Sequence, residues 1–186
     1  MAGRDNRFRI IAGQWRGRKF HFPDIDGLRP TPDRVREMLF NWLQPVISGA
    51  RCLDLYAGSG ALGLEALSRG AASAVFVDSQ RDVIQQIREN LLLINCDTAE
   101  LVQRDVQAYL SGPASQFDIV FLDPPFRQGL IETCCRQLEA GGWLAPRAYV
   151  YLEMEAALSA PGLPDNWQPA KQKQTGQVRS LLAQHT

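Results

Sequence analysis

The sequence predicts an α/β protein built on a doubly wound, mostly parallel sheet of seven strands, with a β-hairpin in front of it. From residue 51 onward, short runs rich in β-branched and aromatic residues alternate with amphipathic runs, the pattern of parallel strands joined by right-handed helical crossovers. Two further runs, on either side of Gly176, predict a closing antiparallel hairpin. The chain has 186 residues, of which 45% are hydrophobic, so it is long enough for one domain with a sizeable core.

Residues 1–28 predict a basic β-hairpin that extends from the main domain, which we place at residues 29–186. Two short β-prone runs, at residues 8–12 and 18–22, flank a turn that contains glycines. Apolar residues alternate with other residues in both runs. This period of two favours a hairpin over a solvated, disordered basic tail.

A helix is predicted to follow the loop Arg29-Pro30-Thr31-Pro32. Thr31 is a good N-cap residue, and Pro32 suits the first helical position, where its missing N–H is not needed. Apolar residues then recur with the spacing of one helix face, at Val35, Met38, Leu39, Trp42 and Leu43. Arg34 and Arg36 fall outside this stripe, so we expect both to face a ligand or solvent.

The remaining elements follow in regular alternation. Strands are predicted where β-branched and aromatic residues cluster, at residues 51–55, 74–77, 100–103, 117–122 and 148–152. Helices are predicted after the first four of them, at residues 61–69, 83–93, 106–110 and 130–138. The closing hairpin is predicted at residues 172–174 and 177–183.

The charges are distributed unevenly along the chain. The totals balance, with 20 basic and 20 acidic residues, yet residues 1–36 hold nine basic and four acidic side chains, and residues 37–170 hold eight and sixteen. Such asymmetry indicates a nucleic-acid partner for the basic segment. The four cysteines form no C-x-x-C pair, and the chain has neither a leader-like start nor a long apolar run. We therefore expect a soluble, cytoplasmic protein without a metal site, a disulfide framework or a membrane partner.

A glycine-rich turn, from Asp54 to Gly63, follows the first strand of the sheet. Glycines there let the backbone approach a ligand closely, and the next helix offers free N–H groups. Gly58, Gly60 and Gly63 formally match the G-x-G-x-x-G pattern of dinucleotide-binding proteins, with Asp78 at the end of the next strand. However, three residues separate Asp54 from the first glycine, and the chain is too short for a hydride-transfer domain. A nicotinamide dinucleotide is therefore not favoured.

The turn Asp123-Pro124-Pro125-Phe126 follows the buried strand at residues 117–122. Its two prolines end that strand and hold an extended turn at the carboxyl end, where open α/β sheets bind ligands. A carboxylate and a backbone carbonyl there can accept both N–H groups of a planar exocyclic amine, and Phe126 can stack on the base. The alternative is a surface turn in which Asp123 only caps the next segment of the chain.

Together these motifs resemble the class I S-adenosylmethionine-dependent methyltransferases, whose sheet is Rossmann-like. Asp54 with its glycine turn, Asp78, Asp105 and the Asp123 turn come in the order and spacing of that superfamily. The closer resemblance is to the RsmD-type 16S ribosomal RNA guanine-N2 methyltransferases, from about residue 8 to residue 182. It is carried by Gly13-Gln14-Trp15-Arg16-Gly17-Arg18, Arg29-Pro30-Thr31, Asp33-Arg34-Val35-Arg36-Glu37, Leu39-Phe40-Asn41-Trp42-Leu43 and the segment from Gly58 to Arg69.

The resemblance implies S-adenosylmethionine as the cofactor and a set of site residues. The implied cofactor-binding residues are Asp54, Tyr56, Gly58, Gly60, Asp78, Asp105 and Val106. Among them, Asp54 would hold the α-amine, Asp78 the ribose hydroxyls, and the last two would border the adenine. The implied residues on the substrate side are Asp123, Pro124 and Phe126 at the target guanine, and Pro125, Arg16, Arg18 and Arg34 at the RNA. Asp105 as the N-cap of the short helix and Asp78 as an ordinary strand-end acid are the structural alternatives.

The implied function is methylation of the exocyclic N2 amine of a guanine in 16S rRNA, within the small ribosomal subunit or its assembly intermediate, by a monomeric enzyme. Two other classes stay open from the residues alone. The first is an amino-methyltransferase that acts on adenine or cytosine in DNA. The second is either an RNA-binding relative without catalytic activity or a dinucleotide oxidoreductase. Chemistry does not separate guanine from adenine at this point, because both bases carry an exocyclic amine.

Overall fold

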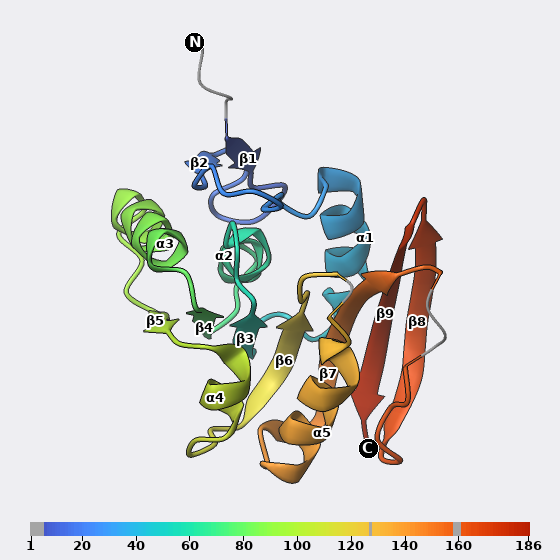
Figure 1. The fold of residues 1–186 in the computed structure, drawn as a ribbon. Helices are drawn as coiled ribbons and strands as arrows, with labels where there is room; N and C mark the ends of the chain where they lie inside the picture. Colours follow the sequence, from blue (N-terminus) through green and yellow to red (C-terminus); the bar gives the residue numbers. More distant parts are fainter. Residues whose placement is uncertain (1–5, 127, 158–160) are drawn as a thin grey trace.

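The computed structural model describes residues 6–126, 128–157 and 161–186 and shows an α/β fold (Figure 1). Within these ranges the main sheet has seven strands, β3 (Arg51–Leu55), β4 (Ser73–Asp78), β5 (Ala99–Gln103), β6 (Phe117–Leu122), β7 (Leu144–Glu155), β8 (Trp167–Thr175) and β9 (Val178–His185). The helices are α1 (Asp33–Leu43), α2 (Ala61–Ser68), α3 (Arg81–Leu93), α4 (Val106–Leu110) and α5 (Leu130–Ala140). A separate two-stranded sheet consists of β1 (Arg7–Arg9) and β2 (Lys19–His21).

The strand order places a topological switch point in the middle of the main sheet. The order is β5-β4-β3-β6-β7-β9-β8; β3 to β7 pair in parallel, and β9 is antiparallel to both of its neighbours. The chain therefore runs outward from β3 to β5 and then returns to the other side of β3. Ligands of open α/β sheets bind at such a point, outside the carboxyl ends of the strands. We call this side of the sheet the carboxyl edge and the opposite side the amino edge.

Helices cover both faces of the sheet, with α1, α2 and α3 on one side and α4 and α5 on the other (Figure 1). Buried strands send alternate side chains into the two layers. In β6, for example, Phe121 packs into the core beneath α1–α3, and Leu122 packs into the core with α4 and α5. Burial on both faces explains why this strand is a continuous apolar run in the sequence. The predicted fold class is confirmed.

The N-terminal hairpin packs on the outer side of α2 (Figure 1). Phe8 and Phe20 pair across its strands and belong to the same apolar core as α2. The following turn is also held by α2, because the Glu65 carboxylate accepts hydrogen bonds from the N–H groups of Ile11 (2.9 Å) and Ala12 (3.0 Å). The predicted hairpin is confirmed. The predicted domain boundary stays a prediction, and apolar contacts of the hairpin cross it.

Arg36 lies in the interior, so the prediction that it faces a ligand or solvent is wrong. It is 0% exposed. Its guanidinium donates to the carbonyl oxygens of Thr31 (3.0 Å) and Arg9 (2.8 Å), and it pairs with Glu65 (3.3 Å) and Asp33 (2.6 Å). Arg36 thus links the hairpin, α1 and α2. The apolar stripe of α1 did not reveal this, because the hairpin covers a second side of the helix.

The start of α1 differs slightly from the prediction. The helix begins at Asp33, with Pro32 at the N-cap position and no side-chain cap, so Thr31 is not the N-cap residue. Arg34 is exposed, as expected. Over the ranges that the structure describes, none of the helices combines the length and the apolar character that crossing a membrane requires.

Candidate active site

The glycine turn after β3 is held by two carboxylates that accept hydrogen bonds from the backbone. Oδ2 of Asp54 accepts from the N–H of Gly63 (2.9 Å), and Oδ2 of Asp78 accepts from the N–H of Gly58 (3.0 Å). Gly58 and Gly60 have φ angles of 53° and 75°, in the left-handed region that favours glycine. The two acids therefore fix a turn whose backbone few other residues could adopt.

Asp54 lies beneath the glycine turn rather than on its surface. It is 2% exposed. Burial raises the pKa of Asp54 to about 8; the hydrogen bond from Gly63 opposes this rise, and the charge of Asp78 adds to it. The structure thus gives Asp54 a structural role in the turn. Its contact with the α-amine of the cofactor stays a prediction.

Tyr56 begins the turn in a conformation that is uncommon for a residue with a side chain. Its φ is 58°, and its hydroxyl lies 3.6 Å from Sγ of Cys134 in α5. Burial, followed by this hydrogen bond, raises the pKa of Tyr56 well above its ordinary value. Left-handed backbone at a non-glycine residue is frequent at ligand sites, where surrounding contacts maintain the strain.

The other predicted cofactor residues border the same edge. Asp78 ends β4, and its second oxygen, Oδ1, accepts from the N–H of Gln80 (2.9 Å). Asp105 is the N-cap of α4, because its Oδ1 accepts from the N–H of Ala108 (3.0 Å). Val106, the next residue, is 2% exposed. The structural alternative for Asp105 is therefore observed, and the adenine contact of this pair stays a prediction.

The Asp123 turn lies next to the glycine turn because β6 pairs with β3. Leu122 at the end of β6 pairs with Leu55 at the end of β3, and also with Leu152 of β7. Asp123 and Tyr56, which follow Leu122 and Leu55, therefore stand side by side at the carboxyl edge. The structure brings the two predicted motifs together at the switch point.

Exposure varies along the Asp123 turn. Asp123 is half-buried and Pro124 is buried, whereas Pro125 is exposed and Phe126 is 43% exposed. A large aromatic side chain that is exposed beside a sheltered acid is available for stacking on a planar ligand. The residue types and their exposure suit a base that is held at its edge by the acid and covered by the ring.

A second carboxylate, Glu153 of β7, lies beside Asp123. The two residues follow directly after paired positions of neighbouring parallel strands, and Glu153 is 7% exposed. The hydroxyl of Tyr151 donates to Oε2 of Glu153 (2.9 Å). Burial, and then the charges of Glu153 and Asp54, raise the pKa of Asp123 well above its ordinary value, and burial raises the pKa of Glu153. The pair therefore keeps a proton at a higher pH than isolated carboxyl groups do.

Comparisons with known proteins identify the family of this chain. Residues 8–184 match the model of the protein family described as Conserved hypothetical protein 95. The chain is 51% identical over 178 residues to ribosomal RNA small subunit methyltransferase D of Escherichia coli strain K12, an alignment that covers 96% of this chain and 90% of that protein. The chain belongs to the RsmD-type methyltransferase family.

Solved structures show the same fold as this RsmD-type chain. The "putative methyltransferase yhhF" from Escherichia coli has a TM-score of 0.91 and 48% identity, and the match covers 96% of this chain and 98% of that one. A "putative methyltransferase complexed with SAH" is 16% identical, with a TM-score of 0.67 over 81% of this chain and 48% of that chain. The second likeness is one of fold alone. The predicted Rossmann-like, class I methyltransferase architecture is confirmed.

The RsmD-type chain presents its predicted RNA-binding arginines at two separate places. Arg34 is exposed in the first turn of α1. Arg16 and Arg18 are exposed in the hairpin, and Nη2 of Arg18 donates to the carbonyl oxygen of Leu93 (3.0 Å), the last residue of α3. Because α3 leads from the carboxyl end of β4 to the amino end of β5, Leu93 lies at the amino edge. The structure therefore does not bring Arg16 and Arg18 to Asp123.

Glu153 is the residue of this candidate site that the sequence did not predict. The predicted strand ended at residue 152, whereas β7 continues to Glu155. A signal was present, since Glu153 is an acid directly after a run of apolar residues, like Asp123 after its own strand. What the sequence alone did not show is that the two strands are neighbours.

Proposed function

We propose that this chain transfers a methyl group from S-adenosylmethionine to the exocyclic N2 amine of a guanine in 16S ribosomal RNA. The observation that carries the proposal is the pair of adjacent carboxyl groups, Asp123 and Glu153, next to a glycine turn at the switch point of the sheet. The relative named ribosomal RNA small subunit methyltransferase D supports RNA of the small subunit as the substrate. The proposal includes a monomer that acts in the cytoplasm, on the small subunit or its assembly intermediate.

The glycine turn and Asp78 fit S-adenosylmethionine. Each oxygen of Asp78 accepts one backbone N–H, and a carboxylate has about four acceptor sites, so Asp78 can also accept from two ribose hydroxyls. At Gly60 a Cβ would lie 3.0 Å from Cγ1 of Ile87, so packing against α3 favours glycine at this position. A neighbour of the same fold was solved with SAH, which supports this class of cofactor. When bound, S-adenosylmethionine supplies an electrophilic methyl group on a positively charged sulfur.

The two carboxyl groups match the edge of guanine that is rich in donors. Guanine presents its N1–H beside the two N–H groups of N2, whereas adenine presents an acceptor, N1, beside its amine. An ionised carboxyl group only accepts hydrogen bonds. The ionised form of Asp123 therefore favours guanine over adenine. We assign the carbonyl oxygen of Pro124 as a further acceptor and Phe126 as the stacking ring, a contact of about 1–3 kcal/mol.

The same pair can receive the proton that the reaction releases. After the methyl group has been transferred, the amine nitrogen is positively charged and loses one proton, so an N–H bond breaks and an O–H bond forms on a carboxyl group. Since burial and the nearby charges raise the pKa of Asp123 well above its ordinary value, this group takes up a proton at a higher pH than an ordinary carboxyl group does. Before transfer, the same negative charge orients the amine and favours the positive charge that develops on nitrogen.

Methylation assays on RNA from a strain that lacks the gene test the proposal. The purified protein and S-adenosylmethionine are incubated with naked 16S rRNA, with small ribosomal subunits and with a DNA duplex, and nucleosides are identified by mass spectrometry. The expected product is N2-methylguanosine at a single RNA position, and Asp123→Ala serves as the impaired control. Methylated adenine or cytosine would overturn the guanine assignment. Binding of the cofactor in calorimetry without any product would instead indicate a non-catalytic relative.

A further inference from the structure

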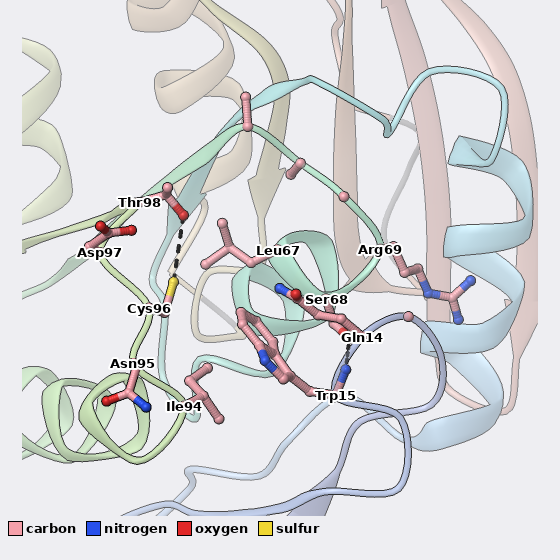
Figure 2. Close-up of a pocket in the computed structure, with 14 residues that line it drawn as sticks. Gln14, Trp15, Leu67, Ser68, Arg69, Ile94, Asn95, Cys96, Asp97 and Thr98 are labelled. Atoms are coloured by element: carbon pink, nitrogen blue, oxygen red, sulfur yellow. Dashed lines mark hydrogen bonds between the residues drawn. The ribbon is translucent and has the colours of Figure 1, made fainter.

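A cavity of about 560 Å³ opens at the amino edge of the sheet, on the opposite side from Asp123. It lies between the turn of the N-terminal hairpin, the end of α2 and the end of α3. Figure 2 shows the indole ring of Trp15 on one side of the cavity and Asn95, Cys96 and Thr98 on the other. Neither the glycine turn nor the Asp123 turn contributes to its lining, so the cavity is separate from the candidate active site.

The backbone around Trp15 is fixed by contacts with the last turn of α2. The N–H groups of Gln14 and Trp15 donate to the carbonyl oxygen (2.8 Å) and to Oγ (3.1 Å) of Ser68, and Oγ of Ser68 donates to the carbonyl oxygen of Ala12 (2.7 Å). The side chain of Trp15 is half-buried against the apolar core. Trp15 is therefore a preformed wall of the cavity rather than part of a loose loop.

The lining suits a flat, neutral ligand with polar edges. Leu67 and Ile94 are buried apolar residues that line the cavity beside the Trp15 ring, and Asn95 and Thr98 supply an amide and a hydroxyl group. The charged residues in the lining are Asp97 and Arg69, and Nε of Arg69 already donates to Glu65 (2.8 Å). A nucleobase has the required flat face and the required donors and acceptors, and unpaired bases commonly stack on aromatic side chains.

Phosphate groups fit outside this cavity rather than within it. The carboxyl ends of α2 and α3 meet there, and the carbonyl groups of helix ends carry partial negative charge. Exposed cations lie close to residues of the lining instead, because Arg16 follows Trp15 directly and Arg18 reaches the end of α3. This combination of an aromatic wall and bordering arginines is how proteins bind single-stranded RNA.

We propose that this cavity binds an unpaired base of the substrate RNA, stacked on Trp15, with Arg16 and Arg18 at the neighbouring phosphates. The inference rests on the proposed function, in that the substrate is an RNA. Because β3 and β5 are each five residues long, at about 3.3 Å per residue the anchored base lies roughly 17 Å or more from the target base at the carboxyl edge. The enzyme would thus hold its substrate at two distant points.

Charge supports an anchor at the amino edge. The carboxyl edge carries the acids Asp54, Asp78, Asp105, Asp123 and Glu153. Phosphates close to the ionised members of this group would be repelled, whereas the hairpin arginines attract them. A surface outside the catalytic edge is therefore better suited to bind the phosphates of the RNA, and the cavity with its arginines provides one.

The first test compares Trp15→Ala with Trp15→Phe, which keeps an aromatic face. The probe is a short unstructured RNA, with affinity measured across a salt series. Trp15→Ala should weaken binding about 5- to 150-fold, the loss of one stacked base. The salt slope should stay the same, whereas Arg16→Ala should reduce it by about 0.7. Trp15→Phe should bind nearly as well as the unaltered protein. Unchanged RNA affinity of Trp15→Ala would overturn the proposal.

A second test needs no substitution at Trp15. All four cysteines lie in the described ranges; Cys52, Cys134 and Cys135 are buried, and Cys96 at the cavity is partly exposed. A maleimide should therefore alkylate Cys96 first, and the short RNA should protect this thiol. Modification of Cys96 should in turn weaken RNA binding, because the label fills the cavity. Equal alkylation rates with and without RNA would overturn the proposal.

These readouts are independent of the proposed reaction. The melting temperature of Trp15→Ala should fall, because the half-buried ring packs against the apolar core, whereas cofactor affinity by calorimetry should equal that of the unaltered protein. A parallel loss of cofactor affinity and RNA binding would show that Trp15 is only structural, and would overturn the cavity site. If N2-methylguanosine forms while the RNA leaves Cys96 unprotected, the cavity proposal fails and the proposed function stands. If the RNA protects Cys96 but no substrate is methylated, the proposed function fails and the cavity remains an RNA site.

Discussion

Replacing Gly13 with alanine should destabilise the protein more than the same replacement at Gly17. Both glycines have left-handed backbone, with φ angles of 86° and 81°. A Cβ on Gly13 would lie 1.8 Å from the carbonyl oxygen of Ser68, whereas a Cβ on Gly17 would meet nothing within 4 Å. Gly17→Ala therefore measures backbone strain alone. Gly13→Ala adds the displacement of the hairpin turn from α2.

The two effects differ in size. Left-handed backbone costs a residue with a side chain about 1–2 kcal/mol, and alanine offsets about 0.4–1 kcal/mol of this by restricting the unfolded chain. Moving the turn also breaks the hydrogen bonds of Gln14 and Trp15 to Ser68, each worth about 0.5–1.5 kcal/mol. The free energy of unfolding should thus fall by about 1 kcal/mol for Gly17→Ala and by about 2–4 kcal/mol for Gly13→Ala.

Urea denaturation followed by circular dichroism measures both losses on the whole protein. The comparison depends on the slope of free energy against urea staying the same in the two variants, since a changed slope indicates a change in the unfolded or native state. Equal losses for Gly13→Ala and Gly17→Ala would refute the argument that the hairpin turn docks rigidly on α2.

Four further predictions concern the carboxylates. In single-turnover methylation with saturating cofactor, Asp123→Ala should lose on the order of a hundredfold to a thousandfold in rate. Asp123→Asn should lose less, because its amide oxygen still accepts a hydrogen bond from the amine. Equal losses of rate in the two variants would contradict an orienting role for Asp123. Glu153→Gln should shift the rise of rate with pH toward lower pH, because it removes a charge that raises the pKa of Asp123; an unshifted profile would count against the pair. Asp78→Ala should weaken S-adenosylmethionine binding in calorimetry by more than about tenfold, since charge-assisted hydrogen bonds are worth about 1.5–3 kcal/mol each. An unchanged affinity for the cofactor would remove Asp78 from the site. The melting temperature should fall as the pH rises from about 4 to about 8, because Asp54 keeps its proton over this range only in the folded state. Asp54→Asn should flatten this dependence of melting temperature on pH. An equally steep dependence in the variant would show that another group is responsible.

Local patterns in the sequence were sufficient to predict the sheet. The strand at residues 117–122 and the helix at residues 106–110 have the predicted bounds, because an apolar run that is buried on both faces and an N-capped amphipathic turn are local signals. The order of motifs along the chain also placed the glycine turn and the Asp123 turn at the same edge. The placement of the two turns depends on the general rule that the carboxyl ends of parallel strands lie at the same edge of the sheet.

Contacts between distant segments could not be predicted in this way. Arg36 lies off the apolar stripe of α1, and it is buried because the hairpin packs over it together with Glu65 from α2. Glu153 lies beside Asp123 because β7 pairs with β6 on one side. On its other side β7 pairs with β9, and this pairing continues the strand past residue 152. In both cases a pairing partner far along the chain decides the environment of the side chain.

The separation of charge between the two edges of the sheet follows from the chemistry proposed for Asp123. A carboxylate that must take up a proton near neutral pH needs a raised pKa, and a neighbouring arginine would lower it. The positive charges proposed to hold the RNA are therefore better placed elsewhere, and the hairpin places Arg16 and Arg18 at the amino edge. The basic first segment and the acidic remainder of the sequence correspond to these two tasks. Because the tasks lie on different surfaces, RNA affinity and the rate of methyl transfer should respond to separate substitutions, the first at the hairpin and the second at Asp123 and Glu153.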